Sequence, residues 1–262
     1  MEVVRSAIYD VLYLSNPMTV RQVFYQLVGQ GVIAKTEAEY KATVVRLLGD
    51  MRRAGDVPFG WIADNTRWMR KPRSYSNLEE ALISTARHYR RAIWQTQDAY
   101  VEIWLEKDAL AGVIYDVTAE WDVPLMVTRG YPSLTFLNGA AEAIQAHGRA
   151  TYLYYFGDYD PSGLDISRKV EHDIREFAPD AEVYFERVAV TASQIADFNL
   201  PTGPTKASDS RSRNFRGESV ELDALPGAAL RAMVRESIER HVDAHKLNVA
   251  RSPRRASGSC SS

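Results

Sequence analysis

Apolar residues recur at helical spacing through the first fifty positions of the chain. Between residues 2 and 15 they form a stripe that includes Val4, Ile8 and Leu12, which predicts an amphipathic helix. Thr19 and Thr36 are residues of a type that caps helix starts, and each precedes a further helical stretch. The expected elements of this helical unit are helices over 2–15, 20–30 and 37–54 and a short β wing over 57–62.

Between residues 99 and 198, short apolar runs alternate with longer amphipathic stretches. The short runs are almost continuously apolar, as expected for strands that are buried on both faces. Regular alternation of strand and helix predicts an α/β domain with a Rossmann-like parallel sheet, covered by helices on both sides. The expected strands are 99–105, 124–128, 151–157 and 181–189, and the expected helices are 108–120, 133–147, 162–177 and 191–198.

The remaining segments connect or extend these two units. Residues 67–76 are basic and polar and are expected to be a connector, and Asn77 can cap a helix that reaches about residue 95. Residues 201–219 have no periodicity and are expected to form a mobile loop before a helix over 226–244. The Ser/Arg-rich end is expected to be disordered. The predicted division is a helical domain over 1–75, a connecting helix within 76–98, an α/β domain over 99–200, a loop and helix over 201–245, and a basic tail over 246–262.

Two aspartates stand where the third expected strand ends. Asp158 and Asp160 have one residue between them, so their side chains point the same way in an extended backbone. Pro161 suits the first turn of the next helix, where its missing N–H has no cost. Glu106 follows the first expected strand, and carboxylates that meet at the end of a parallel sheet favour Mg²⁺. The alternative is that the aspartates cap the helix and Glu106 lies on the surface.

Three motifs at strand ends carry a resemblance to a known family. They are the acid after the first strand, a Gly-Tyr-Pro turn at 130–132 and Asp-x-Asp-Pro-x-Gly at 158–163. Together they resemble a Toprim domain, in a form similar to the catalytic A subunit of archaeal topoisomerase VI and to its relative, the meiotic double-strand-break transesterase. The resemblance covers most of the chain, which is short for an A subunit and would be a reduced form. It implies a winged-helix domain followed by the Toprim domain.

The resemblance implies roles for individual residues. In the family, the positions of Glu106, Asp158 and Asp160 hold Mg²⁺ during phosphoryl transfer. Lys107 follows the first acid as it does in the family, where it would help to hold phosphate; the alternative is a solvent-exposed lysine. Tyr131, in the Gly-Tyr-Pro turn, is expected to have a structural role.

The second expected helix carries a candidate nucleophile. Tyr25 falls off the centre of the buried stripe, and Arg21 lies four residues earlier on the same face. A neighbouring arginine would stabilise phenolate character in a group whose ordinary pKa is near 10. In the resembled family, an Arg-x-x-Tyr-Tyr segment carries the DNA-cleaving tyrosine in its last position, which Tyr25 matches, whereas Phe24 replaces the first tyrosine. The alternative is that Tyr25 is an ordinary partly buried aromatic residue.

The distribution of charge says more than the net charge of −2. Between Lys41 and Arg73 there are eight basic and three acidic residues. One basic run is usually a solvated face, but beside a set of acids suited to a metal it favours a partner with a phosphate backbone. The third helix of a winged-helix domain would read the major groove. The candidate DNA contacts are Lys41, Arg46, Arg52, Arg53, Arg67, Arg70 and Lys107.

The composition of the chain indicates the cellular compartment in which the protein is expected. The chain has 262 residues and one cysteine, Cys260, which excludes an intrachain disulfide framework and fits a reducing compartment. No apolar run approaches the length of a membrane span. We expect a soluble intracellular protein, cytoplasmic and associated with the nucleoid.

These features predict a Mg²⁺-dependent transesterase that cleaves double-stranded DNA. Tyr25 would attack a phosphodiester and leave a 5′-phosphotyrosyl link and a free 3′ hydroxyl. The resemblance implies a homodimer, in which the tyrosine of one protomer faces the metal site of the other, and an ATPase B-type subunit in trans. Two alternatives remain open, which are a Toprim endonuclease that hydrolyses DNA and a DNA-binding protein that does no chemistry.

Overall fold

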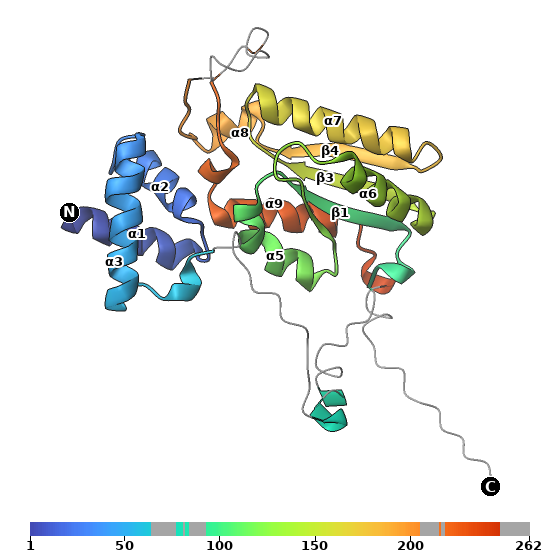
Figure 1. Cartoon of the computed structure of the whole chain (residues 1–262), viewed down its shortest axis with the longest axis horizontal. Helices are drawn as coiled ribbons and strands as arrows, with labels where there is room; N and C mark the ends of the chain where they lie inside the picture. Colours follow the sequence, from blue (N-terminus) through green and yellow to red (C-terminus); the bar gives the residue numbers. More distant parts are fainter. Residues whose placement is uncertain (64–76, 81, 84–92, 205–214, 216–217, 247–262) are drawn as a thin grey trace.

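The computed structural model describes residues 1–63, 77–80, 82–83, 93–204, 215 and 218–246. The described chain forms a helical unit at one end and an α/β unit that holds a parallel sheet (Figure 1). The predicted α/β class with a parallel sheet is therefore confirmed.

The helical unit contains the expected helices. Thr19 caps the second of them through a capping box, in which its hydroxyl accepts the N–H of Gln22 and the Gln22 side chain accepts the N–H of Thr19. Gly55, with φ of 85°, ends the third in a left-handed conformation that suits glycine. The helices are α1 (Glu2–Ser15), α2 (Val20–Gly29) and α3 (Arg46–Ala54), the last continuing a π-helical turn, η1 (Glu39–Val45).

The β wing predicted over 57–62 is wrong. Residues Phe59–Trp61 form a 3₁₀ turn, and Ile62 makes one isolated parallel bridge with Met18. Pro17, beside Met18, has no N–H to donate to a strand ladder. Among the described residues, the segment over 57–62 makes this one bridge, and the finer winged-helix description stays a prediction.

The sheet has the order β2-β1-β3-β4, with every neighbouring pair parallel. Helices α6 and α7 cover one face, and α5 and α9 cover the other (Figure 1). The strands are β1 (Ala99–Leu105), β2 (Leu125–Val127), β3 (Ala150–Phe156) and β4 (Val183–Ala189). The helices of this unit are α5 (Ala111–Glu120), α6 (Leu134–His147), α7 (Pro161–Phe177), α8 (Ala192–Asp197) and α9 (Gly227–Glu239).

Several predicted boundaries differ from the structure. The helix expected from residue 108 begins as a 3₁₀ turn and becomes α-helical at Ala111, and the one expected to reach residue 244 ends at Glu239. Asn77 accepts the N–H of Glu80 as a cap. The connector over 67–76, most of the helix expected to follow it and the basic tail lie outside the described residues. Within the described part of the chain, no helix is long and apolar enough to cross a membrane.

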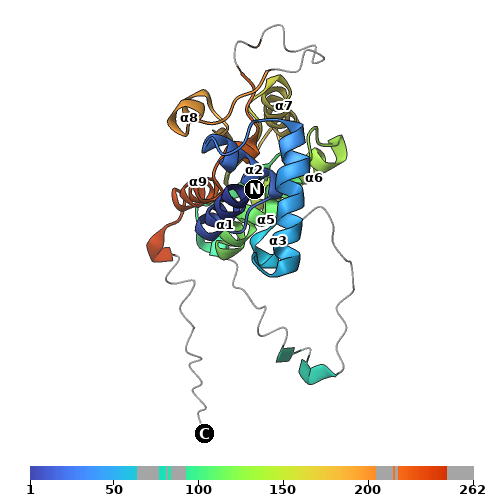
Figure 2. The same cartoon turned by 90° about the vertical axis from the view of Figure 1, so that its left-hand side faces the viewer.

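The helical unit and the α/β unit share a hydrophobic core. One cluster of buried side chains joins Leu12 and Leu27 of the helical unit to Leu222 and Leu230. In Figure 2 the helical unit faces the viewer, with the α/β unit behind it. Arg231 of α9 stabilises this contact, because its guanidinium donates hydrogen bonds to main-chain carbonyls at the end of α1 and just after it. The two units are therefore held in a fixed relation, which positions α2 at the sheet.

A buried acid makes the stability of the sheet depend on pH. Glu102 of β1 is 2% exposed, and its Oε2 accepts a hydrogen bond of 2.8 Å from the indole of Trp104. Burial raises the pKa of Glu102 to about 7, although the bond from Trp104 opposes this. Ionisation inside the core therefore disfavours the folded state.

We expect the Glu102→Gln variant to gain stability relative to wild type as the pH is raised from 5 to 8. The folded pKa lies above the unfolded value, so wild type loses stability as pH rises through the interval from about 4.5 to 7. A shift of this size corresponds to about 3 kcal/mol at most. Thermal unfolding of both proteins across this range is the measurement, because other titrating groups are common to both. A difference between them that did not vary with pH would contradict the assignment.

Candidate active site

The carboxyl ends of β1 and β3 lie side by side. The N–H of Glu106 donates to the carbonyl of Phe156 at 2.9 Å, which extends the β1–β3 pairing past the last strand residues. The carboxylate Oε2 of Glu106 then accepts the N–H of Asp158 at 3.0 Å. The sequence prediction that these two strand ends are neighbours is confirmed.

Asp160 has a structural task at the start of α7. Its Oδ1 accepts the N–H of Gly163 at 2.7 Å as the N-cap, and Pro161 occupies the first turn as predicted. The capping alternative thus holds for Asp160. It does not hold for Asp158, whose carboxylate faces Lys107. Between them, Tyr159 pairs through its main chain with Val220, which brings a later segment of the chain to the site.

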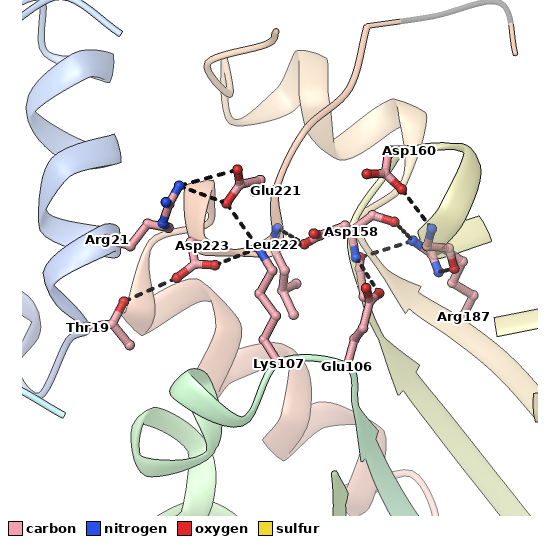
Figure 3. Close-up of polar contacts among 12 residues, drawn as sticks. Thr19, Arg21, Glu106, Lys107, Asp158, Asp160, Arg187, Glu221, Leu222 and Asp223 are labelled. Atoms are coloured by element: carbon pink, nitrogen blue, oxygen red, sulfur yellow. Dashed lines mark hydrogen bonds and ion pairs between the residues drawn. The ribbon is translucent and has the colours of Figure 1, made fainter. Parts of the chain in front are cut away.

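That segment is an acidic turn, residues 221–225, which includes a 3₁₀ turn over Leu222–Ala224. The ammonium of Lys107 lies among three carboxylate oxygens, 3.1 Å from Asp158, 3.0 Å from Glu221 and 2.9 Å from Asp223 (Figure 3). The N–H of Leu222 also donates to Asp158, at 2.7 Å. Lys107 is therefore neither a solvent lysine nor free to hold phosphate in this arrangement.

The same turn binds α2 and so connects the helical unit to the sheet. The hydroxyl of Thr19 donates to Asp223 at 3.2 Å, and Arg21 pairs with Glu221 at 3.4 Å (Figure 3). Gln26 donates to the carbonyl of Ala224 at 3.3 Å. A continuous polar chain thus runs from α2 through the acidic turn to Lys107 and Asp158.

The charged side chains at the strand ends are buried and close together, and both conditions shift their pKa values. Burial, and then the nearby Asp158, raise the pKa of Glu106 to about 7. Burial also raises the pKa of Asp158, although Lys107 opposes it. Burial alone would lower the pKa of Lys107, but the carboxylates around it raise that pKa well above its ordinary value. The site therefore favours additional positive charge near Glu106.

The donor set fits a hard divalent cation by chemistry, because Glu106, Asp158 and Asp160 all offer carboxylate oxygens. Their oxygens do not form a closely spaced group. Within the described ranges, the three side chains whose ligand atoms all lie within 4.8 Å of one another are His172, Asp173 and Glu176 on α7. Two members of that group are exposed, and such groups are common without an ion. Mg²⁺ binding by the strand-end acids remains a prediction.

Tyr25 and Arg21 differ in part from expectation. They interact as predicted, but Tyr25 is 3% exposed, whereas Val20 and Val28 of the expected stripe are only partly buried. Burial, and then the carboxylate of Glu221, raise the pKa of Tyr25, and Arg21 only partly offsets them. Arg21 thus favours the phenolate as predicted, but burial and the Glu221 carboxylate of the acidic turn outweigh its effect on the pKa of Tyr25 in this arrangement.

A cavity of about 630 Å³ separates the helical unit from the sheet end. Tyr25 is not among its lining residues. Cations and carboxylates face each other across it, which is an environment suited to an anion together with a metal. Its charged lining residues are Arg21, Arg52, Lys107, Asp108, Asp158, Glu221 and Asp223.

The candidate DNA contacts lie in different surroundings. Lys41 pairs with Glu37 and Arg53 with Asp50 on the outer surface, and Arg46 is exposed. Arg52 instead lines the cavity, and its guanidinium lies 4.5 Å from the centre of the Phe59 ring. Arg67 and Arg70 fall in a part of the chain that the structure does not describe.

The Gly-Tyr-Pro turn has the structural character that was expected. Gly130 has φ of 81°, a conformation that glycine adopts without strain. The hydroxyl of Tyr131 donates to Asp165 on α7 at 2.7 Å. The tyrosine therefore holds the β2–α6 connection against α7.

Sequence reasoning missed Glu221, Asp223 and Arg187. The first two repeat the acid-x-acid spacing of Asp158 and Asp160, and this spacing is the signal that could have drawn attention to them. Arg187 directly follows Glu186 within β4, and nothing in this charged pair of residues places the Arg187 side chain under the site.

Comparisons with known proteins do not assign a family to this chain. A scan against protein-family models found no match, and a search of curated proteins found none either. The resemblance to Toprim enzymes therefore rests on the motifs themselves.

Proposed function

We propose that the chain is a Mg²⁺-dependent DNA-cleaving transesterase similar to the A subunit of topoisomerase VI, acting on double-stranded DNA as a homodimer. One observation carries the proposal, namely the cavity that Arg21 of α2 and the strand-end Asp158 line together. Guanidinium groups pair well with phosphate oxygens, and carboxylates hold the cation that phosphoryl transfer requires. A cavity with both kinds of group suits a phosphodiester.

In the proposed reaction, the Tyr25 phenol oxygen bonds to phosphorus and the bond from phosphorus to the 3′ oxygen breaks. The phenol proton passes to solvent water, and the 3′ oxygen takes up a proton from water. Arg21 would bind the phosphate oxygens. Held by Glu106, Asp158 and Asp160, Mg²⁺ would neutralise the phosphodiester and the charge that develops on the 3′ oxygen.

This reaction requires α2 to move away from the acidic turn, because Tyr25 is buried beneath it. The contacts to be broken include those from Arg21 to Glu221 and from Thr19 to Asp223. DNA binding, dimer formation or an ATPase B-type partner would supply the energy. The burial of Tyr25 also favours a second candidate, a hydrolytic endonuclease in which water is the nucleophile and Tyr25 is structural.

We expect Tyr25→Phe and Asp158→Ala each to lower DNA cleavage by ~10³-fold or more. The assay incubates the protein with supercoiled plasmid and Mg²⁺, quenches with detergent and looks for linear DNA that carries covalent protein. Tyr9→Phe is the control, because Tyr9 is a 40% exposed tyrosine of α1 whose ring packs on Tyr13 and Trp61, and it should cleave normally.

The other outcomes separate the alternatives. Cleavage that survives Tyr25→Phe but not Asp158→Ala would identify a hydrolytic nuclease. DNA binding without cleavage, both alone and with an ATPase B-type subunit, would leave a protein that does no chemistry. Mixing the two variants tests the dimer, because nicking returns only if the tyrosine of one protomer serves the metal site of the other.

A further inference from the structure

Arg187 of β4 lies beneath the turn that carries the strand-end aspartates (Figure 3). One terminal nitrogen of its guanidinium donates to the carbonyl of Gly163 at 3.2 Å. The other donates to the carbonyls of Gly157, at 3.0 Å, and of Asp158. A single planar side chain thus binds both ends of the segment between β3 and α7.

A β-bulge accompanies this arrangement. Tyr155 of β3 pairs with Arg187, but the next residue, Phe156, pairs with Ala189, so the register shifts immediately after the arginine. Bulges redirect side chains and are common near functional sites. The guanidinium lies 5.8 Å from the centre of the Tyr155 ring, and its Nε is buried without a hydrogen-bond partner among the described residues.

The segment that Arg187 binds is closely packed at both of its glycines. A Cβ on Gly157 would lie 2.4 Å from Glu106 Oε2, and a Cβ on Gly163 would lie 2.3 Å from the carbonyl oxygen of Asp158. Small displacements of this backbone would therefore change the separation of Glu106 and Asp158. Glu106, Asp158 and Asp160 all act on the guanidinium electrostatically, which makes it a fixed positive charge behind the carboxylates.

We propose that Arg187 is a positioning residue for the metal site, and this inference rests on the proposed function. Its fork of donors fixes the main chain of residues 157–163, which limits how far the carboxylates must move to bind a divalent cation. The geometry of the fork matters as well as its charge, because a lysine ammonium cannot reproduce planar contacts to carbonyls at both ends of the segment.

The test measures Mn²⁺ binding to the full chain by calorimetry for wild type, Arg187→Lys and Arg187→Gln. We expect both variants to bind Mn²⁺ about 10-fold to 100-fold more weakly, as found when residues that orient metal ligands are replaced. Arg175→Gln is the matched control. Arg175 also donates to a carbonyl of β4, that of Val183 at 2.8 Å, but at the opposite end of the strand.

Hydrogen exchange of residues 157–163 in the metal-free protein gives a second readout. The amides of Asp158 and Gly163 bond to the carboxylates of Glu106 and Asp160, and we expect both to exchange faster in the Arg187 variants than in Arg175→Gln. Lower thermal stability with unchanged Mn²⁺ affinity and unchanged exchange would show a merely structural role and overturn the inference. Full Mn²⁺ affinity in Arg187→Lys would overturn the requirement for the fork.

The same measurements separate a failure of the proposed function from a failure of the proposed role of Arg187. If wild type binds no Mn²⁺, the metal site is wrong, and the exchange rates alone decide whether Arg187 positions the segment. If wild type binds Mn²⁺ and the Arg187 variants bind it equally well, the metal site stands and the role of Arg187 is wrong.

Discussion

Replacing Lys107 with methionine is expected to lower the free energy of unfolding by about 3 kcal/mol. The ammonium is the shared partner of Asp158, Glu221 and Asp223, and Asp223 is 2% exposed. Methionine keeps the length of the side chain but leaves three carboxylates close together without that charge. Chemical denaturation of both proteins at neutral pH is the measurement.

Lys169→Met provides the comparison. Lys169 also forms a short ion pair, 2.7 Å from Asp173, but its side chain is 41% exposed. The lysine is the exposed partner, and the buried Asp173 keeps a second contact with His172 at 3.2 Å, so this variant should lose only about 1 kcal/mol. A Lys107→Met variant as stable as Lys169→Met would show that the three carboxylates do not depend on the ammonium.

A second substitution tests the repulsion between the carboxylates around Lys107. Asp223→Asn should destabilise wild type, because it weakens the contact with Lys107, but it should stabilise the Lys107→Met variant by about 1 kcal/mol. This change of sign is the non-additivity expected of groups in direct contact. Additive effects of the two substitutions would count against a coupled charge cluster.

Gly163→Ala is expected to destabilise the protein by about 1–3 kcal/mol, as overpacking does. The new Cβ would meet the main-chain carbonyl oxygen of Asp158 at 2.3 Å, and a main-chain atom cannot rotate away. Either α7 loses its cap from Asp160 or the turn at Asp158 shifts. Thermal unfolding measures the first effect, and a weaker response of the melting temperature to Mn²⁺ measures the second.

Gly139→Ala is the matched helical control and should have the opposite sign. Gly139 lies on the exposed side of α6, and a Cβ there would meet nothing within 4 Å. Alanine in such a helix interior is favoured over glycine by about 1 kcal/mol. If both substitutions destabilised the protein equally, the close approach at Gly163 would not be the cause.

Much of the fold could be predicted from local pattern. Periodicity, the Thr19 and Asn77 caps and the Gly55 stop are short-range signals, and the structure bears them out. Alternation of strand and helix gave the parallel sheet, and this placed Glu106 beside Asp158. The wing at 57–62 could not be judged in this way, because a strand needs a partner, and in the described part of the chain Ile62 pairs with Met18 through one bridge only.

The content of the site was less predictable, because it depends on contacts between distant parts of the chain. Helical spacing correctly related Arg21 to Tyr25, but the acidic turn that covers Tyr25 comes about 200 residues later. Lys107 was expected at the surface or on phosphate, and its three carboxylate partners come from two further segments. A periodicity of three or four residues carries no information about such long-range partners.

The polar chain from α2 to the sheet also sets the order in which the protein can mature. Thr19 and Asp223, which are hydrogen-bonded, are 204 positions apart in sequence, so this link can form only after residue 223 has left the ribosome. Contacts across such separations close late and slowly in folding. A nascent chain that ended before residue 221 would contain every strand-end acid but not the acidic turn. The charge cluster around Lys107 would then be incomplete until the acidic turn has been synthesised.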